Sequence, residues 1–106
     1  MKKKTLCFDL DNVICTTYKN HYTKSKPKKK IVNLINQLYD QGFIIKILTA
    51  RYSGRFNDDF SKVKKKGFKK TSNQLNKWGL KYHKLFMTKP SFDFYIDDKS
   101  YAFNNN

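Results

Sequence analysis

Four short apolar runs along the chain predict β-strands. They cover residues 5–8, 43–48, 85–87 and 92–96. The first two are apolar at successive positions, which is typical of parallel strands that are buried on both faces. The fourth alternates around Asp93.

A helix is predicted between the first two runs. Five apolar residues recur at the i, i+3, i+4, i+7 and i+8 spacing that places them on one helix face. They are Ile31, Leu34, Ile35, Leu38 and Tyr39. Pro27 suits the first helical position, and Gly42 suits the residue just past the end.

The remaining segments carry weaker patterns. Residues 12–26 hold β-branched and aromatic side chains without a helical period, which favours a loop or a small hairpin flap. A short helix is expected over about residues 71–78, with Leu75 and a core Trp78 on one face. The Lys-rich residues 62–70 fit either a solvated helix face or a loop, and we favour a low-complexity segment.

The order strand, helix, strand, helix, strand, strand predicts an α/β fold with a Rossmann-like parallel sheet flanked by helices. A chain of 106 residues has room for one such domain. Residues 12–30 are enough for a flap but not for a cap domain. Because ligands of such sheets bind beyond the carboxyl ends of the strands, chemistry is expected just after each apolar run.

The composition is strongly basic and favours an anionic ligand. Lys and Arg number 23 against 8 acidic residues, a net charge of +15. Nucleic acid is one ligand class that fits. However, all but two of the basic residues are Lys, whereas base readout favours Arg. The A-rich codons of an A/T-rich genome would also supply Lys and Asn. We therefore rank small phosphate-bearing molecules ahead of nucleic acid.

The acidic residues point to a site. All eight are Asp, and four of them form two tight pairs that follow apolar runs. The pairs are Asp9/Asp11 and Asp97/Asp98. Two other polar residues, Thr49 and Lys89, also follow apolar runs. Carboxylates that face each other repel unless a cation lies between them, and Mg²⁺ prefers such hard oxygen ligands. A hydroxyl and an ammonium group can hold a phosphoryl group, so this set predicts phosphoryl transfer.

Four segments resemble, in order and spacing, the motifs of the haloacid dehalogenase-like phosphatases. They are Asp9-Leu10-Asp11-Asn12-Val13, Thr49-Ala50-Arg51, Lys89-Pro90 and Ile96-Asp97-Asp98-Lys99. The resemblance spans residues 5–98. Within this family, the chain most resembles the small capless phosphatases of capsule and lipopolysaccharide biosynthesis clusters. It implies a Mg²⁺-dependent phosphomonoesterase that acts through an aspartyl-phosphate on a small phosphosugar or related metabolite. Asn12-Val13 departs from the commoner Gly-Thr of the family.

The resemblance also implies residue roles. Asp9 is the expected nucleophile and Asp11 the general acid and base. Thr49 is expected to hold the phosphoryl group, and Lys89 to stabilise the developing charge. The implied metal ligands are Asp9, the main-chain carbonyl of Asp11, Asp97 and Asp98. A carboxylate at position 11 favours a phosphatase over the dehalogenases and ATPases of the family.

The rest of the substrate is expected to contact Arg51, Tyr52 and Arg55, with Tyr18 or Tyr22 reaching in from the flap. Each of these residues fits an ordinary surface position equally well. An open site of this kind either admits a large substrate or is covered by a second subunit. A homo-oligomer is therefore one expectation.

The chain is expected to be cytoplasmic and free of disulfides. No apolar run approaches the ~20 residues of a membrane span, and the first run is too short for a signal peptide. Cys7 fits a small buried hydrophobe, and either it or Cys15 would be a nucleophile only beside a base. His21 and His83 are expected to be structural or exposed.

Two other functions stay open. A nucleic-acid 3′-end phosphatase is supported by the basic charge and predicts activity that falls steeply with salt. A non-catalytic nucleic-acid-binding protein predicts Mg²⁺-independent binding that is indifferent to Asp9→Asn. The intact set of motifs argues against this last function.

Overall fold

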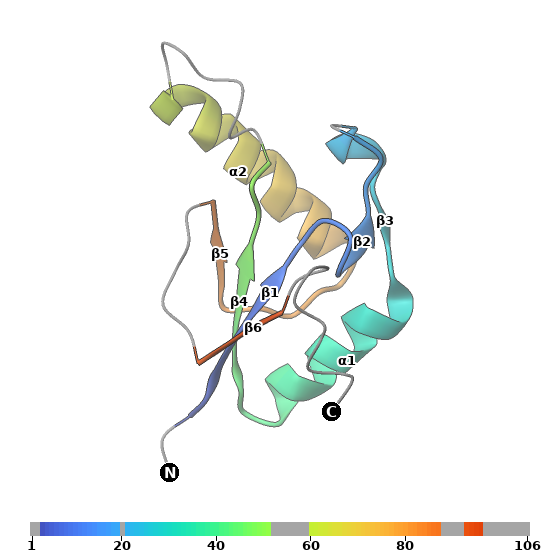
Figure 1. Cartoon of the computed structure of the whole chain (residues 1–106), viewed down its shortest axis with the longest axis vertical. Coiled ribbons are helices and arrows are strands. Elements are labelled where there is room, and N and C mark those ends of the chain that lie inside the picture. The colour runs from blue at the N-terminus through green and yellow to red at the C-terminus, as the bar shows by residue number, and fades with distance from the viewer. Residues whose placement is uncertain (1–2, 20, 52–59, 88–92, 97–106) are drawn as a thin grey trace.

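A parallel four-stranded sheet forms the centre of the protein (Figure 1). The structure is a computed structural model that describes residues 3–19, 21–51, 60–87 and 93–96. Its strands are β1 (Thr5–Asp9), β4 (Ile44–Leu48), β5 (Lys84–Phe86) and β6 (Phe94–Ile96), in the order β5-β4-β1-β6. The predicted α/β fold with a Rossmann-like parallel sheet is confirmed. All four predicted strands are present, with ends shifted by one or two residues.

The register brings the carboxyl ends of the strands to one edge. Asp9 is paired with Leu48, the last residue of β4, and Leu48 is paired with Phe86, the last residue of β5. On the other side, Phe8 is paired with Ile96, the last residue of β6. Residues that follow these strands therefore start from a common edge, as the sequence predicted.

Two helices supply the core: α1 (Lys29–Asp40) and α2 (Phe60–Lys77). Alternate strand residues face them and join one buried cluster with residues of both helices, so α1 and α2 pack on the same face of the sheet. The buried members include Phe8, Ile45, Ile47, Leu85, Val32, Ile35 and Leu75. Trp78 packs against this cluster and stays partly exposed. Among the described residues, neither helix combines the length and apolar character needed to cross a membrane.

The first helix begins later than the sequence predicts. Pro27 is not its first residue but lies in strand β3 (Lys26–Pro27), and Lys28 is the N-cap. Pro is accepted in a short edge strand as well as at a helix start, so the sequence does not separate the two. The helix ends at Asp40, and Gly42 lies just past its end as predicted, with a φ of 101° that is favourable only for Gly.

The second helix is much longer than predicted. Of the two alternatives for residues 62–70, the structure shows the helix and not the loop, because α2 already begins at Phe60. The preference for a merely low-complexity segment was therefore wrong. In its described part, the buried positions Gly67, Thr71 and Leu75 recur every four residues, while the lysines between them are exposed. Two of these three buried residues are small or polar. The buried positions therefore follow a helical period, but too few of them are large apolar residues for a hydrophobic pattern to reveal it.

A small flap lies between β1 and α1, as predicted. It consists of β2 (Cys15–Thr16) and β3, paired antiparallel, with the short helix η1 (Tyr22–Lys24) between them. In Figure 1 it stands beside the carboxyl end of β1, next to α2. Whether the whole chain forms a single domain stays a prediction.

Candidate functional site

The chain turns sharply as it leaves β1. The Leu10 amide still donates to the Leu48 carbonyl (2.9 Å), which continues the sheet by one residue. Asn12 then takes a left-handed conformation with a φ of 69°, and its amide donates to the Cys15 carbonyl (2.7 Å). Asn tolerates this conformation better than most residues other than Gly. Asp11 is thereby placed between the sheet edge and the flap.

The Asp11 carboxylate accepts hydrogen bonds from Thr17, Thr49 and Arg51, and a longer one from the Cys15 thiol at 3.7 Å. Thr17 Oγ1 of the flap donates to Oδ1 at 2.6 Å, and Thr49 Oγ1 donates to Oδ2 at 3.1 Å. Arg51 donates through Nε (3.0 and 3.1 Å to the two oxygens) and through Nη2 (2.8 Å to Oδ1). These donors come from the flap and from the segment after β4. Both carboxylate oxygens are therefore fixed in direction.

Arg51 is buried and occupied by protein partners. Its side chain is 1% exposed, and besides Asp11 it donates to Gln74 Oε1 (2.7 Å) and Ser25 Oγ (3.1 Å). Gln74 Nε2 in turn donates to the Tyr22 carbonyl (2.8 Å), and the Tyr22 ring lies 5.0 Å from the guanidinium carbon. Arg51 thus joins Asp11, the flap and α2 in one hydrogen-bonded network. A direct contact between Arg51 and a substrate stays a prediction.

Thr49 also serves Asp11 in this structure. Its amide donates to the Phe86 carbonyl (2.9 Å), so it extends the pairing of β4 with β5. Its hydroxyl is fully buried, donates to Asp11 and accepts from the Arg51 amide at 3.0 Å. Thr49 lies at the sheet edge where it was expected. Its contact with a phosphoryl group stays a prediction.

The other predicted site residues fall in two groups. Asp9 is the last residue of β1 and is partly buried. The predicted residues Tyr52, Arg55, Lys89, Asp97 and Asp98 lie outside the described residues. The sequence places Lys89 three residues after β5 and Asp97 directly after β6.

A magnesium site fits this edge in its donor chemistry. The Asp9 carboxylate and the Asp11 carbonyl are hard oxygen donors, and β6 ends beside Phe8, next to Asp9 in the sequence. The Asp11 carboxylate itself is taken up by Arg51 and two hydroxyls, which leaves its main-chain carbonyl for the predicted metal role. Within the part of the chain that the structure describes, three or more metal-ligating side chains do not cluster. The predicted ligand set therefore depends on Asp97 and Asp98.

Cys15 lies against the network but has the wrong character for a nucleophile. It is fully buried, and its Sγ lies 3.4 Å from Thr17 Oγ1 and 3.7 Å from Asp11 Oδ1. Burial is the main cause that raises the pKa of the Cys15 thiol above its ordinary value of 9.0. The thiol is therefore protonated near neutral pH and unreactive. Cys7 is buried as predicted.

His83 is structural, as expected. Its Nδ1 accepts a hydrogen bond from the Ile45 amide (2.9 Å), and its ring stacks on Tyr39 with 4.6 Å between the centroids. His21 is exposed on the flap. Neither side chain joins the Asp11 network.

Thr17, Ser25 and Gln74 belong to the site although the sequence did not single them out. They lie in the flap and in α2, and nothing in their neighbourhoods separates them from other polar residues. One signal was available for the network as a whole. Arg51 is one of only two Arg among 23 basic residues, and Arg in place of Lys is typical of forked, buried carboxylate pairing.

The comparisons with known proteins support the fold. The chain matches no protein-family model and no curated protein. It is similar to a crystal structure of a protein from Vibrio cholerae, with 25% identity and a TM-score of 0.73 over 92% of this chain and 81% of the other. It also resembles part of a chain in the structure of the Pnkp1/Rnl/Hen1 complex, with 16% identity and a TM-score of 0.55. A second structure, of the Pnkp1/Rnl/Hen1 RNA repair complex, gives 14% identity and a TM-score of 0.53.

The two similarities differ in extent. This chain spans most of the Vibrio protein but less than a third of the chains in the repair complexes, at 29% and 28% of their lengths. At these identities the repair-complex structures show a shared fold.

Proposed function

We propose that this protein is a Mg²⁺-dependent phosphomonoesterase. The observation that carries the proposal is the Asp11 carboxylate, which is held at the carboxyl edge of the sheet two residues after Asp9. Thr17 of the flap and Thr49 and Arg51 of the segment after β4 fix it there. Two carboxylates so close in the chain, one at the strand end and one oriented beyond it, suit a nucleophile and a general acid.

The proposed reaction has two halves. An oxygen of Asp9 attacks the phosphorus, and the bond to the leaving oxygen breaks as that oxygen takes a proton from Asp11. Water then attacks the phosphorus of the aspartyl-phosphate, Asp11 takes the proton from the water, and the bond between the phosphorus and Asp9 breaks.

Arg51 and the two hydroxyls contribute by orienting Asp11. The Asp11 side chain is 21% exposed, whereas the Arg51 side chain is 1% exposed, so Asp11 is the member of the pair that faces solvent. Fixing a general acid in one direction lowers the entropic cost of reaching the transition state.

Four residues would hold Mg²⁺: Asp9 and Asp11, the latter through its carbonyl, and Asp97 and Asp98. When bound, the ion supplies charge stabilisation to the phosphoryl oxygens. Lys89 is proposed to add a further positive charge there. The resemblance stated above favours a small phosphosugar or related metabolite, with Tyr52 and Arg55 as proposed contacts.

The test is phosphate release from phosphosugars, small phosphate esters and 3′-phosphorylated oligonucleotides, with and without Mg²⁺. We expect release to require Mg²⁺, to be abolished by Asp9→Asn, and to fall about 10²- to 10⁴-fold in Asp11→Asn. Asp40→Asn is the matched control, because Asp40 is an exposed carboxylate paired with Lys81. Equal activity of Asp9→Asn and Asp40→Asn would refute the proposal.

A nucleic-acid end phosphatase is the second candidate. The net charge of +15 and the similarity to part of an RNA repair complex favour it. In the same assay, this function predicts preference for the 3′-phosphorylated oligonucleotide and a steep loss of activity between 50 and 200 mM salt, on the order of 10³-fold for six or more phosphate contacts.

A further inference from the structure

A groove runs between the flap and the second half of α2. Its larger hollow has a volume of about 660 Å³ and is lined by Thr23 of the flap, by Lys70, Asn73 and Lys77 of α2, and by Trp78 just after the helix. A second hollow of about 380 Å³ shares Lys77 and Trp78 and continues toward α1. The two hollows lie on either side of these shared residues, and together they are called the groove. Volumes of this size are typical of sites that hold a ligand.

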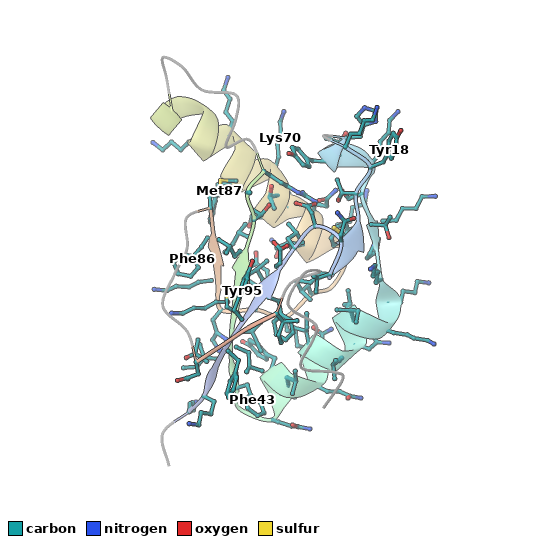
Figure 2. The ribbon with its side chains drawn as sticks, in the orientation of Figure 1. Tyr18, Phe43, Lys70, Phe86, Met87 and Tyr95 are labelled. Atoms are coloured by element: carbon teal, nitrogen blue, oxygen red, sulfur yellow. The ribbon has the colours of Figure 1, made fainter. Side chains whose placement is uncertain are left out.

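The lining of the groove is basic and rich in amides. The described residues around it include three lysines, Lys29, Lys70 and Lys77, and no carboxylate. They also include Asn33, Asn73 and Gln74, which can both donate and accept hydrogen bonds. The groove is thus complementary to an extended anion that also offers hydrogen-bonding groups. Figure 2 shows Lys70 at the end of the molecule that also carries Tyr18 of the flap.

Trp78 gives the groove an aromatic surface. It is the only Trp in the chain, its side chain packs against the core and is partly exposed, and it lines both hollows. An exposed aromatic face between lysines is how proteins bind single-stranded nucleic acid: bases stack on the ring, and phosphates lie against the basic side chains. A simple polyanion would gain nothing from the ring.

We propose that this groove binds single-stranded nucleic acid, with a base stacked on Trp78 and neighbouring phosphates at Lys70 and Lys77. The binding does not depend on phosphatase chemistry. The inner wall of the groove includes Ser25 and Gln74, which also contact Arg51. A strand in the groove would therefore lie against two members of the hydrogen-bonded network that holds Asp11.

The first test uses Trp78 itself as the probe. Short oligodeoxythymidine strands are titrated into the whole chain without Mg²⁺ while tryptophan fluorescence is followed. We expect saturable quenching. Inorganic polyphosphate of similar length gives the comparison, because it carries the charge without bases. The proposal would be overturned if polyphosphate quenched the fluorescence with the same affinity as the oligonucleotide. It would also be overturned if the oligonucleotide caused no quenching.

Charge variants then locate the site. Lys70→Gln with Lys77→Gln is compared with Lys65→Gln and Lys66→Gln, which remove the same charge from exposed positions of the same helix. The dependence of log affinity on log salt should become shallower by about 1.4 in the groove variant, since each phosphate contact contributes about 0.7 for single strands. The control pair should keep both the slope and the affinity. Equal changes in the two pairs would show a diffuse charge effect and refute a groove site.

The stacking contribution is measured with a dye-labelled oligonucleotide. Trp78→Leu should weaken binding between roughly 5- and 100-fold, the range of one stacked base, whereas Trp78→Phe should recover part of the loss. Binding that is unchanged in Trp78→Leu would exclude the stacked base. Because these assays contain no Mg²⁺ and their oligonucleotides carry no terminal phosphomonoester, they can fail while the phosphatase test succeeds, and the reverse.

Discussion

Two ion pairs of nearly equal length lie in contrasting surroundings. The Arg51–Asp11 pair measures 2.8 Å and its side chains are 1% and 21% exposed, whereas the Lys81–Asp40 pair measures 2.9 Å with 49% and 58%. Distance alone would rank them together. Burial separates them, because a charge without water must be satisfied by protein groups, while an exposed charge keeps its hydration.

The partners of the two cations show the same contrast. The Arg51 guanidinium reaches Asp11, Ser25 and Gln74 at once, so its donors are distributed over three segments. The Lys81 ammonium contacts the two oxygens of Asp40 alone among the described side chains. The first pair is therefore a structural junction at the candidate site, and the second is a surface contact.

Breaking the buried pair should have the largest effect. In Arg51→Met the Asp11 carboxylate loses its charged donor and keeps two hydroxyl donors and the Cys15 thiol, and Ser25 and Gln74 lose a partner. We expect a loss of about 3 kcal/mol in the free energy of unfolding. Lys81→Met, the matched control, should lose less than about 1 kcal/mol. Urea unfolding followed by circular dichroism measures both, and similar losses would mean that burial does not set the value of the pair.

A substitution that keeps the charge sharpens the comparison. In Arg51→Lys one ammonium group cannot reach Asp11, Ser25 and Gln74 together, so buried groups are left unpaired at a cost of about 2 kcal/mol. This corresponds to a fall of about 10 °C in the melting temperature for a domain of this size. Lys81→Arg should stay within about 0.5 kcal/mol of the parent. A melting temperature unchanged in Arg51→Lys would show that charge, and not the fork of donors, matters.

A substitution with a smaller expected effect tests whether the buried pair is linked to the flap. Gln74→Met removes the partner of Arg51 Nη1 and of the Tyr22 carbonyl, and it should cost about 1 to 2 kcal/mol. The Ser25 amide, which donates to Tyr22, should then exchange its hydrogen faster. Asn76→Met, at an exposed position of the same helix, is the control. Unchanged exchange at Ser25 in Gln74→Met would show that Gln74 does not hold the flap.

Salt should have the smallest effect and should act on one pair only. At 1 M salt the screening length is about 3 Å, so the difference between the parent and Lys81→Met, under about 1 kcal/mol at low salt, should vanish. The larger loss in Arg51→Met should persist because its charges are shielded from the solvent. Parallel urea titrations at low and high salt measure this, and an equal decline for both variants would contradict the distinction.

The sequence predicted the sheet well and the second helix poorly, for a common reason. The strands β1 and β4 are marked by large apolar side chains, which leave an unambiguous pattern. In α2 the buried positions include Gly67 and Thr71, which are not apolar enough to reveal the helical period. A residue's burial depends on how close its neighbours come, and sequence periodicity does not report that distance.

The candidate site was predicted in position but not in its connections. Asp9, Asp11 and Thr49 follow strands, and the rule that ligands bind at the carboxyl edge locates them correctly. The burial of Arg51 was not foreseen, because it arises from Ser25 and Gln74, which lie 26 and 23 residues away in the chain. Such contacts are consequences of packing, and no local pattern encodes them.

The position of β1 between β4 and β6 has a consequence for how the chain folds. The Asp93 amide donates to the Thr5 carbonyl (3.0 Å), and the Thr5 amide donates to the Asp93 carboxylate (2.7 Å), so the contact closes a loop of 88 residues. Non-local strand pairing of this kind is slow, because the loop must be closed before the contact stabilises anything. A chain emerging from the ribosome therefore presents an unpaired edge of β1 until residue 96 has left the exit tunnel. During synthesis that edge is a natural place for a chaperone to bind or for aggregation to start.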